Sequence, residues 1–292
     1  MRYVKENDRL RLEVDSFGAE IKSVRSKETG EEYMWCGDQR FWGRTSPVLF
    51  PFVGSLKNKE YVYQGRRYPM GQHGFARDME HHLTAESDTE LWFLLRSSDV
   101  TMEKYPFAFE LQIGYELIDN QIRVMWRVKN TGEERMYFSI GAHPAFNCPI
   151  HGEADKSGYG IYFGGVEEIR HHGNTLDTGL AVKEDLVLPL KDGVAGITPD
   201  FFDRCTYMIE GNQTGEAALV DPQGRHYVTV KFDTPLFAVW SPEKKNAPFV
   251  CIEPWYGRCD SVDFEGTLEE REYTNAIDGG ESFQAEYSMA FA

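Results

Sequence analysis

The 292-residue chain lacks any long apolar run. No stretch approaches the roughly 20 apolar residues that a membrane helix needs, and residues 1–20 show no positively charged and then apolar leader. Cysteine is scarce as well: five residues, an odd number, are widely scattered with no C-x-x-C spacing. We therefore expect a cytoplasmic protein with free thiols that does not enter a membrane.

Positive charge is also in short supply. Lysine and arginine total 31 against 47 aspartate and glutamate residues, which gives a net charge of −16. Such a chain repels nucleic acid and anionic membranes at long range, so neither is an expected partner. The sequence has no H-x-H or H-E-x-x-H run and no G-x-G-x-x-G or P-loop motif, so we expect no metal and no nucleotide cofactor.

Helical periodicity is nearly absent. Only two short helical turns are predicted, at residues 101–104 and 267–272, and the first is stopped by Tyr105-Pro106. No linker, low-complexity tract or fixed-period repeat divides the chain. We therefore expect residues 1–292 to form a single domain.

What the sequence does contain is alternation of apolar and polar residues, the pattern of half-buried strands. It occurs at residues 10–14 and again at 109–117 and 122–128, which are separated by turn residues and predict an antiparallel hairpin. Two further apolar runs flank the turn sequence Asp221–Gly224. The pattern predicts an all-β fold, a large antiparallel sandwich of two sheets with few short helices.

Four segments do not resemble ordinary core strands. Each surrounds one ionisable side chain with glycine, proline and aromatic residues, which restrict the backbone and exclude water. This composition is typical of a small-molecule pocket. The segments are WGRTSPVLFPFVG (42–54), GQHGFARD (71–78), GAHPAFN (141–147) and CIEPWYGRCD (251–260), and their ionisable residues are Arg44, His73, His143 and Glu253.

Two of these side chains suit proton transfer. Pro144 keeps His143 out of the α region, and a histidine can give or take a proton near neutral pH. Glu253 ends an apolar run and precedes Pro-Trp-Tyr, so partial desolvation should raise its basicity towards that of a general base. The structural alternatives are a hydrogen-bonded core histidine and a rim carboxylate paired with Arg258.

The remaining candidates suit sugar binding. His73 lies between glycines that permit a tight turn, so its side chain is expected to hold a hydroxyl. Arg44 can present its guanidinium to sugar oxygens, unless it forms a salt bridge with an acidic neighbour. Trp255, Tyr256 and Phe75 can stack on the apolar face of a pyranose.

Together the four segments resemble the galactose mutarotase (aldose 1-epimerase) superfamily, specifically its LacX-like branch. The resemblance covers most of the chain, from the strand at residues 10–14 almost to the C-terminus. It implies a β-supersandwich that interconverts the α and β anomers of a hexose without a cofactor. It also implies that Glu253 takes the proton of the anomeric hydroxyl and that His143 protonates the ring oxygen.

The same resemblance implies that His73 and Arg44 grip sugar hydroxyls. A mid-chain aspartate of the family matches Asp203, with Asp200 as a competitor three residues away. The histidine-rich second motif of the galactose mutarotases is replaced here by QHGFAR (72–77), which leaves the preferred sugar open.

The chemistry of the residues agrees with this reaction. Opening a cyclic hemiacetal needs one base at the C1 hydroxyl and one acid at the ring oxygen, and a protonated histidine with an ionised glutamate can exchange these roles. Three alternatives stay open. The first is a glycosidase, which needs a second carboxylic acid in a pocket motif as distinct as that of Glu253. The second is a non-catalytic carbohydrate-binding protein. The third is a hexose-6-phosphate epimerase that would use Arg77, Lys57 and Lys59. The oligomeric state is not readable, and a homodimer is one option.

Overall fold

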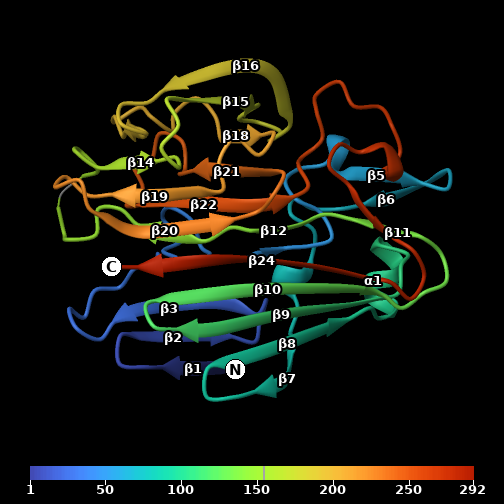
Figure 1. Cartoon of the computed structure of the whole chain (residues 1–292). Helices are drawn as coiled ribbons and strands as arrows, with labels where there is room; N and C mark the ends of the chain where they lie inside the picture. Colours follow the sequence, from blue (N-terminus) through green and yellow to red (C-terminus); the bar gives the residue numbers. More distant parts are fainter. Residues whose placement is uncertain (154) are drawn as a thin grey trace.

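β-Strands are the main regular structure in the computed structural model, which describes residues 1–153 and 155–292 (Figure 1). The one α-helix in these residues, α1 (Asp99–Lys104), begins at a capping box of Ser98 and Thr101 and ends at Tyr105, where the sequence predicts a helical turn. Three short 3-10 helices are η1 (Lys57–Lys59), η2 (Ala76–Asp78) and η3 (Leu268–Glu270), the last at the second predicted turn. None of the described helices has the length and apolarity to cross a membrane.

The largest sheet has nine strands, and all of its neighbouring strands are antiparallel. In spatial order they are β17 (Val194–Gly196), β14 (Gly160–Tyr162), β19 (Glu216–Val220), β20 (His226–Phe232), β24 (Ser282–Phe291), β10 (Gln121–Asn130), β9 (Phe109–Ile118), β8 (Glu90–Arg96) and β7 (His82–Glu86). The predicted hairpin is β9–β10. The predicted turn joins β19 to β20, and in it the Gly224 amide donates to the Asp221 carbonyl at 2.9 Å.

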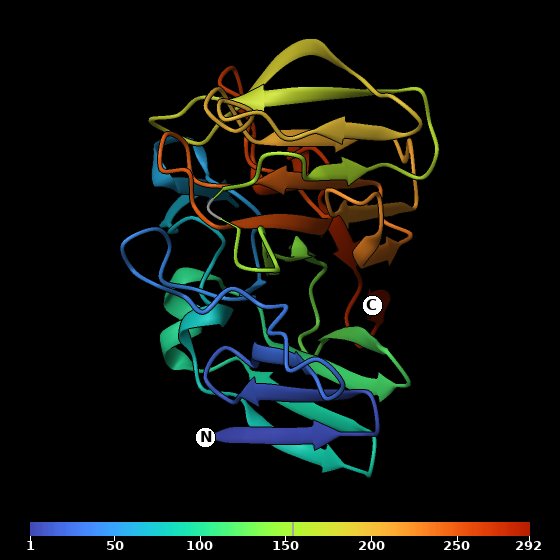
Figure 2. The ribbon, with the colours of Figure 1, turned by 90° about the vertical axis from the view of Figure 1, so that its left-hand side faces the viewer.

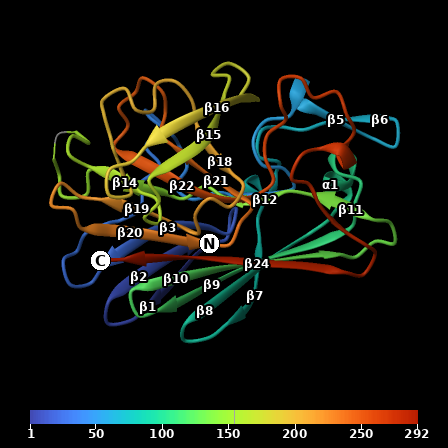
Figure 3. The same ribbon diagram turned by 45° about the horizontal axis from the view of Figure 1, so that its top comes forward.

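The second large sheet carries the strand that matters most for the site. Its order is β16 (Ala181–Pro189), β15 (Glu168–Asn174), β18 (Tyr207–Glu210), β21 (Leu236–Trp240), β22 (Phe249–Tyr256), β12 (Ile140–Ala142) and β4 (Val48–Leu49), and β13 (Ala145–Asn147) also pairs with β22. The strands from β15 to β22 lie side by side in Figure 3. Neighbours flank β22 on both edges, and seven of its eight residues are buried.

Three small sheets complete the fold. They are β1 (Arg2–Glu6), β2 (Leu10–Asp15) and β3 (Glu20–Ser26); β5 (Glu60–Tyr63) with β6 (Arg66–Pro69); and β11 (Met136–Phe138) with β23 (Asn275–Ile277). Figure 2 shows the N-terminal sheet at the opposite end of the molecule from β15 and β16.

The core is rich in aromatic side chains. The Phe50 ring lies 5.1 Å from that of Phe109 and 5.9 Å from that of Phe138, and Trp126 on β10 is 1% exposed. Alternating burial along β10 matches its sequence pattern, because every second residue faces this core. The all-β antiparallel prediction is confirmed, with three small sheets added to the two large ones, whereas the single-domain organisation stays a prediction.

Candidate active site

Strand β22 delivers two side chains to one cavity. Residues two apart on a strand share a face, so Glu253 and Trp255 point the same way, together with Cys251. Glu253 is 1% exposed. Trp255 pairs with Gly141 of β12, and a Cβ at Gly141 would lie 2.6 Å from the Trp255 ring. Only glycine therefore allows β12 to pass this close to the tryptophan.

His143 follows β12 and faces Glu253. Its Nε2 lies 3.4 Å from the Glu253 Oε2, and its ring stacks on Trp42 at a centroid distance of 4.6 Å. Neither His143 Nδ1 nor Glu253 Oε2 has a hydrogen-bond partner within the described residues, although both atoms are buried. Buried polar atoms are normally paired, so these two are available to a ligand.

His73 approaches the same place from a strained turn. Its backbone has φ of 65°, and a Cβ at the next residue, Gly74, would lie 2.3 Å from the Phe50 carbonyl oxygen. The Gly54 amide donates to His73 Nδ1 at 3.0 Å. In the neutral ring the proton is therefore on Nε2, which makes that nitrogen a donor. The His73 and His143 ring centroids are 5.5 Å apart.

A cavity of about 330 Å³ lies between these segments. This volume is at the small end of the range for small-molecule pockets, about 300 to 1,000 Å³. Three tryptophans, several hydroxyl and amide side chains, and both acidic and basic groups line it. The lining residues are Trp42, Gly54, Ser55, Gln72, His73, Arg77, His143, Asn174, Leu176, Asp177, Thr178, Gly179, Thr206, Met208, Trp240, Glu243, Glu253, Trp255 and Cys259.

Burial controls the charges of the site. It raises the pKa of the Glu253 carboxyl well above its usual range, because a buried carboxylate loses its hydration. Burial, and secondarily the charge of Arg77, lowers the pKa of His143 to about 3 and also lowers the pKa of His73. The pair thus favours a protonated Glu253 beside a neutral His143, the reverse of the arrangement expected from the sequence. The two arrangements differ only in whether the one shared proton is on Glu253 or on His143.

Arg77 is the cation that lines this cavity in the described part of the chain. Its side chain is 14% exposed, and burial lowers its pKa to about 10. One terminal nitrogen donates to the Gln72 carbonyl at 2.7 Å, while the buried Nε has no hydrogen-bond partner. The Asp78 carboxylate lies 3.9 Å from this Nε, too far for a hydrogen bond.

A buried ion pair supports the loop that holds His73. The Asp260 carboxylate accepts from Arg271 Nε at 2.7 Å and from the Lys57 amide at 2.9 Å, and the Asp260 amide donates to the Ser55 carbonyl at 3.0 Å. The Arg271 and Asp260 side chains are 2% and 4% exposed. They fix residues 55–57, which directly follow the Gly54 amide that orients His73.

Three predicted site residues lie elsewhere. Arg44 forms an ion pair with Asp78 at 2.7 Å and lines an open groove beside the cavity, not the cavity itself. Phe75 packs edge-on against core rings, including Phe50 at 6.5 Å. Asp203 accepts from the Lys244 amide at 2.8 Å and is absent from the cavity lining. Each of these side chains is held by a partner that the local sequence does not reveal.

Two other sequence alternatives can be placed as well. Asp200 accepts from the Thr198 hydroxyl at 2.8 Å and does not line the cavity. Arg258 lies 2.9 Å from Glu210, so it is not the partner of Glu253 that the rim-carboxylate alternative required.

Sequence reasoning also missed part of the lining. Arg77 belongs to the second motif, where the sequence indicates only a role in phosphate binding, yet it lines the cavity. Asn174 ends β15, and residues 176–179 come from the connection between β15 and β16, which carries no sequence signal of its own. Trp240 and Glu243 come from β21 and the loop after it.

One group of side chains at this site has donor atoms that a metal ion could use. Within the part of the chain that the structure describes, His143, Cys251 and Glu253 are the one group of three potential ligands with donor atoms within 4.8 Å of one another. Nitrogen, sulfur and oxygen donors suit zinc. The Arg77 charge that acts on His143 opposes a cation there, so the donor set does not by itself indicate a metal centre.

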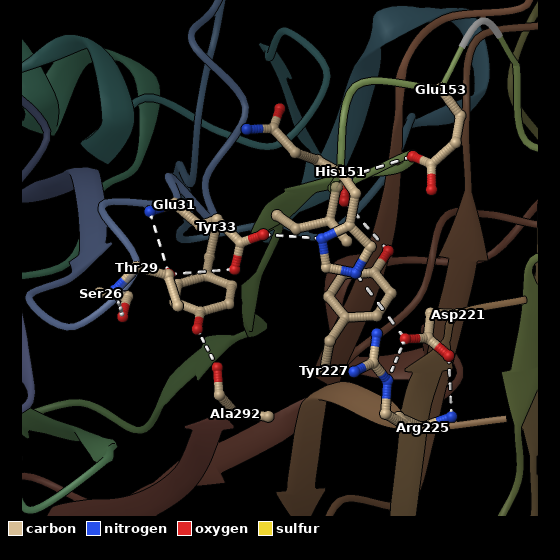
Figure 4. Close-up of polar contacts among 12 residues, drawn as sticks. Ser26, Thr29, Glu31, Tyr33, His151, Glu153, Asp221, Arg225, Tyr227 and Ala292 are labelled. Carbon is tan, nitrogen blue, oxygen red and sulfur yellow. Dashed lines mark hydrogen bonds and ion pairs between the residues drawn. The ribbon is translucent and has the colours of Figure 1, made fainter. Parts of the chain in front are cut away.

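A second cavity, of about 390 Å³, lies near the C-terminal end of β24, and Figure 4 shows polar contacts among residues that line it. His151 connects its two sides: Nδ1 lies 2.7 Å from the Glu31 carboxylate and Nε2 lies 3.7 Å from Asp221. Arg225 Nε donates to Asp221 at 2.7 Å, and the Tyr227 hydroxyl donates to the Asn147 carbonyl at 3.0 Å. None of these described side chains has a buried polar atom without a partner.

Fold and site together define a cavity of small-molecule size in an antiparallel β protein, and comparison with known proteins supplies the family. The family model described as aldose 1-epimerase matches residues 1–289, so the chain belongs to the aldose 1-epimerase family. The chain is 28% identical over 275 residues to Protein LacX of Lactococcus lactis subsp. lactis, a match that covers 91% of each chain.

Solved structures of similar sequence have the same fold. A galactose mutarotase related enzyme from Lactobacillus acidophilus is 33% identical, with a TM-score of 0.92 over 100% of this chain and 97% of the other. A galactose mutarotase-like protein from Lactobacillus casei is 27% identical, with a TM-score of 0.92 and full coverage of both chains. The galactose mutarotase-like fold expected from the sequence is thus confirmed, while the roles of individual site residues stay predictions.

Proposed function

We propose that this protein is an aldose 1-epimerase that interconverts the anomers of a free hexose, with Glu253 and His143 as its proton-transferring pair. One observation carries the proposal. Two buried ionisable groups lie 3.4 Å apart at a cavity for a small ligand, and each retains a polar atom without a partner. A group held in this way needs a reason other than stability, because unpaired buried polar atoms cost free energy.

The reaction needs one proton on the pair. In ring opening, the Glu253 carboxylate takes the proton of the C1 hydroxyl as the C1=O bond forms. The bond between C1 and the ring oxygen breaks, and that oxygen takes a proton from His143. Rotation about the C1–C2 bond presents the other carbonyl face, and the reverse transfers close the ring as the other anomer.

Burial makes both transfers more favourable. A raised pKa makes the Glu253 carboxylate a stronger base, and a lowered pKa makes protonated His143 a stronger acid. The ion pair is thus the reactive form of the pair. Hydrogen bonds from the C1 hydroxyl to Glu253 and from His143 to the ring oxygen would stabilise it when a sugar binds.

Other lining groups suit sugar binding. His73 Nε2 would donate to a ring hydroxyl, and the Arg77 guanidinium, which also lines the cavity, would supply a further donor. Trp42, Trp240 and Trp255 provide flat apolar walls for a pyranose face.

The lining favours a neutral sugar over a sugar phosphate. Arg77 is accompanied by the carboxylates of Asp177 and Glu243, and phosphate sites usually combine several cations. Lys57 forms an ion pair with Glu265 at 2.5 Å, and neither Lys57 nor Lys59 lines the cavity.

Anomer exchange on freshly dissolved α-D-glucose, α-D-galactose and glucose 6-phosphate, followed by polarimetry or NMR, tests the proposal. Wild-type protein should accelerate exchange of a free hexose, and Glu253→Gln should lower kcat by about 10² to 10⁴-fold, the range for general acid–base residues. Sugar binding without acceleration would instead indicate a non-catalytic carbohydrate-binding protein. Circular dichroism of the variant is the control for folding.

A further inference from the structure

We propose that Glu20 is a positioning residue for the acid–base pair, because its carboxylate anchors the chain segment that holds His143 beside Glu253. This inference rests on the proposed function. Glu20 begins β3 in the N-terminal sheet and does not line the active-site cavity. Its side chain is only 7% exposed, and a carboxylate this deeply buried is costly unless it has partners.

The partners of Glu20 include two backbone amides. Its Oε1 accepts from the Thr45 amide at 2.7 Å and from the Ser46 amide at 2.9 Å. Its Oε2 accepts from Lys22 Nζ at 2.9 Å. Thr45 and Ser46 are buried, so loss of the carboxylate would leave two buried amides without an acceptor. Glu20 therefore ties residues 45–46 to the N-terminal sheet.

The opposite side of the same segment holds the backbone of His143. The Pro47 carbonyl accepts from the His143 amide at 3.2 Å. The Thr45 carbonyl accepts from the Ala145 amide at 2.9 Å. These bonds continue the antiparallel pairing of β4 with β12. Thr45 is thus bound to Glu20 through its amide and to Ala145 through its carbonyl, which links the carboxylate to the histidine through a single residue of backbone.

The segment also restrains the ring of His143. Trp42, three residues before Thr45, stacks on this ring at a centroid distance of 4.6 Å with the planes 27° apart. The ring in turn places Nε2 3.4 Å from Glu253 Oε2. A shift of residues 42–47 would therefore move both the backbone and the ring of His143, and a misplacement of about 1 Å can cost about 10²-fold in rate.

Glu20 can act as an anchor because its own backbone is fixed. Gly18, which has φ of 73°, donates its amide to the Met79 carbonyl at 2.8 Å. The Ala19 carbonyl accepts from the buried hydroxyl of Tyr115 on β9. The turn before β3 is thus bound to two other parts of the molecule, so the carboxylate cannot simply follow a displaced segment.

Three substitutions separate the position of the acceptor from its charge. Glu20→Gln keeps an oxygen that can accept from both amides, so kcat for hexose anomer exchange should stay within about threefold of wild type. Glu20→Asp keeps the charge but withdraws it by about 1.5 Å, and Glu20→Ala removes the acceptor. Both should lower kcat by about 10 to 10²-fold. An active Glu20→Asp beside an impaired Glu20→Gln would mean that charge matters and would overturn the inference.

Asp221→Ala is the matched control for losing a buried carboxylate. The Asp221 side chain is 1% exposed, accepts from the Gln223 and Arg225 amides at 2.9 Å each, and does not line the active-site cavity. Urea unfolding should show lower stability for both alanine variants. Only Glu20→Ala should change kcat of the folded protein by more than about twofold. Equal losses of kcat in the two variants would show that Glu20 has only a general structural role.

Amide hydrogen exchange, followed by NMR, separates this inference from the proposed function because it needs no turnover. The His143 and Ala145 amides should exchange about tenfold faster in Glu20→Ala than in Asp221→Ala. Amides of β10, which is paired on both sides, should exchange at similar rates in the two variants. If wild-type protein accelerates no sugar, the proposed function fails and this measurement still decides: equal protection of His143 in the two variants would overturn the role of Glu20.

Discussion

Two cavities in the described part of the molecule differ in how their polar groups are paired. The larger, near His151, contains a histidine, carboxylates and an arginine that bind one another (Figure 4). The smaller, near Glu253, keeps unpaired atoms on His143, Glu253 and Arg77. Cavity size would select the first and chemistry selects the second. Unsatisfied buried groups, more than volume, indicate where a ligand belongs.

Matched histidine variants at the two cavities should show the largest difference in activity. We expect His143→Asn to lower kcat for hexose anomer exchange by about 10² to 10⁴-fold, because the acid at the ring oxygen is lost. His151→Asn, at the other cavity, should leave kcat within about twofold. Polarimetry on both variants checks this, and a large loss from His151→Asn would mean that satisfied networks also take part in turnover.

Two arginine–aspartate pairs give the next largest effect. Arg271 and Asp260 are both buried, so Arg271→Leu leaves an uncompensated buried carboxylate and should cost about 3–5 kcal/mol of unfolding free energy. Arg225 is 66% exposed, and the buried Asp221 carboxylate also accepts from the amides of Gln223 and Arg225, each at 2.9 Å. Arg225→Leu leaves these bonds in place and should cost about 1 kcal/mol or less. Urea unfolding measures both, and similar losses would show that burial is not what separates the pairs.

The pH dependence of stability tests whether burial raises the pKa of Glu253. Its pKa is raised by burial in the folded state, so its contribution is fully present below the unfolded pKa near 4.5 and is lost as pH rises through the folded pKa. Relative to Glu253→Gln, wild-type protein should therefore lose about 1.4 kcal/mol of unfolding free energy per pH unit between pH 4.5 and the raised folded pKa. Parallel stability curves for the two proteins would contradict the raised pKa.

The smallest expected effect concerns Arg77. Arg77→Gln removes a donor with one unpaired nitrogen from the cavity, and we expect KM for a hexose to rise about tenfold with a smaller change in kcat. Arg225→Gln is the matched control and should leave KM unchanged. A fall in kcat without a change in KM would instead assign Arg77 to the transition state.

Local patterns predicted much of the fold, and tertiary contacts decided the rest. The β9–β10 hairpin could be found because its alternation and its turn lie within 22 consecutive residues, from Phe109 to Asn130. His143, Glu253 and His73 could be found because proline and glycine neighbours mark them. Arg44 could not be placed, because Asp78, 34 residues away, determines where its guanidinium lies.

The sequence also could not predict which of His143 and Glu253 carries the proton. Ordinary pKa values favour protonated His143 with ionised Glu253, and only burial reverses that order. Asp203 illustrates the same limit, because the amide of Lys244, in a distant loop, holds its carboxylate.

The pairing of Gly141 with both Leu49 and Trp255 has a consequence for how the protein folds. These three strands come from distant parts of the chain, and closing such long loops is slow compared with forming a hairpin such as β9–β10. The pairing of β12 with β22 brings His143 to Glu253, and the pairing of β12 with β4 places β12 at this edge of the sheet. After dilution from denaturant, we therefore expect anomer exchange to return with the slowest refolding phase, which makes turnover a late and stringent marker of the completed fold.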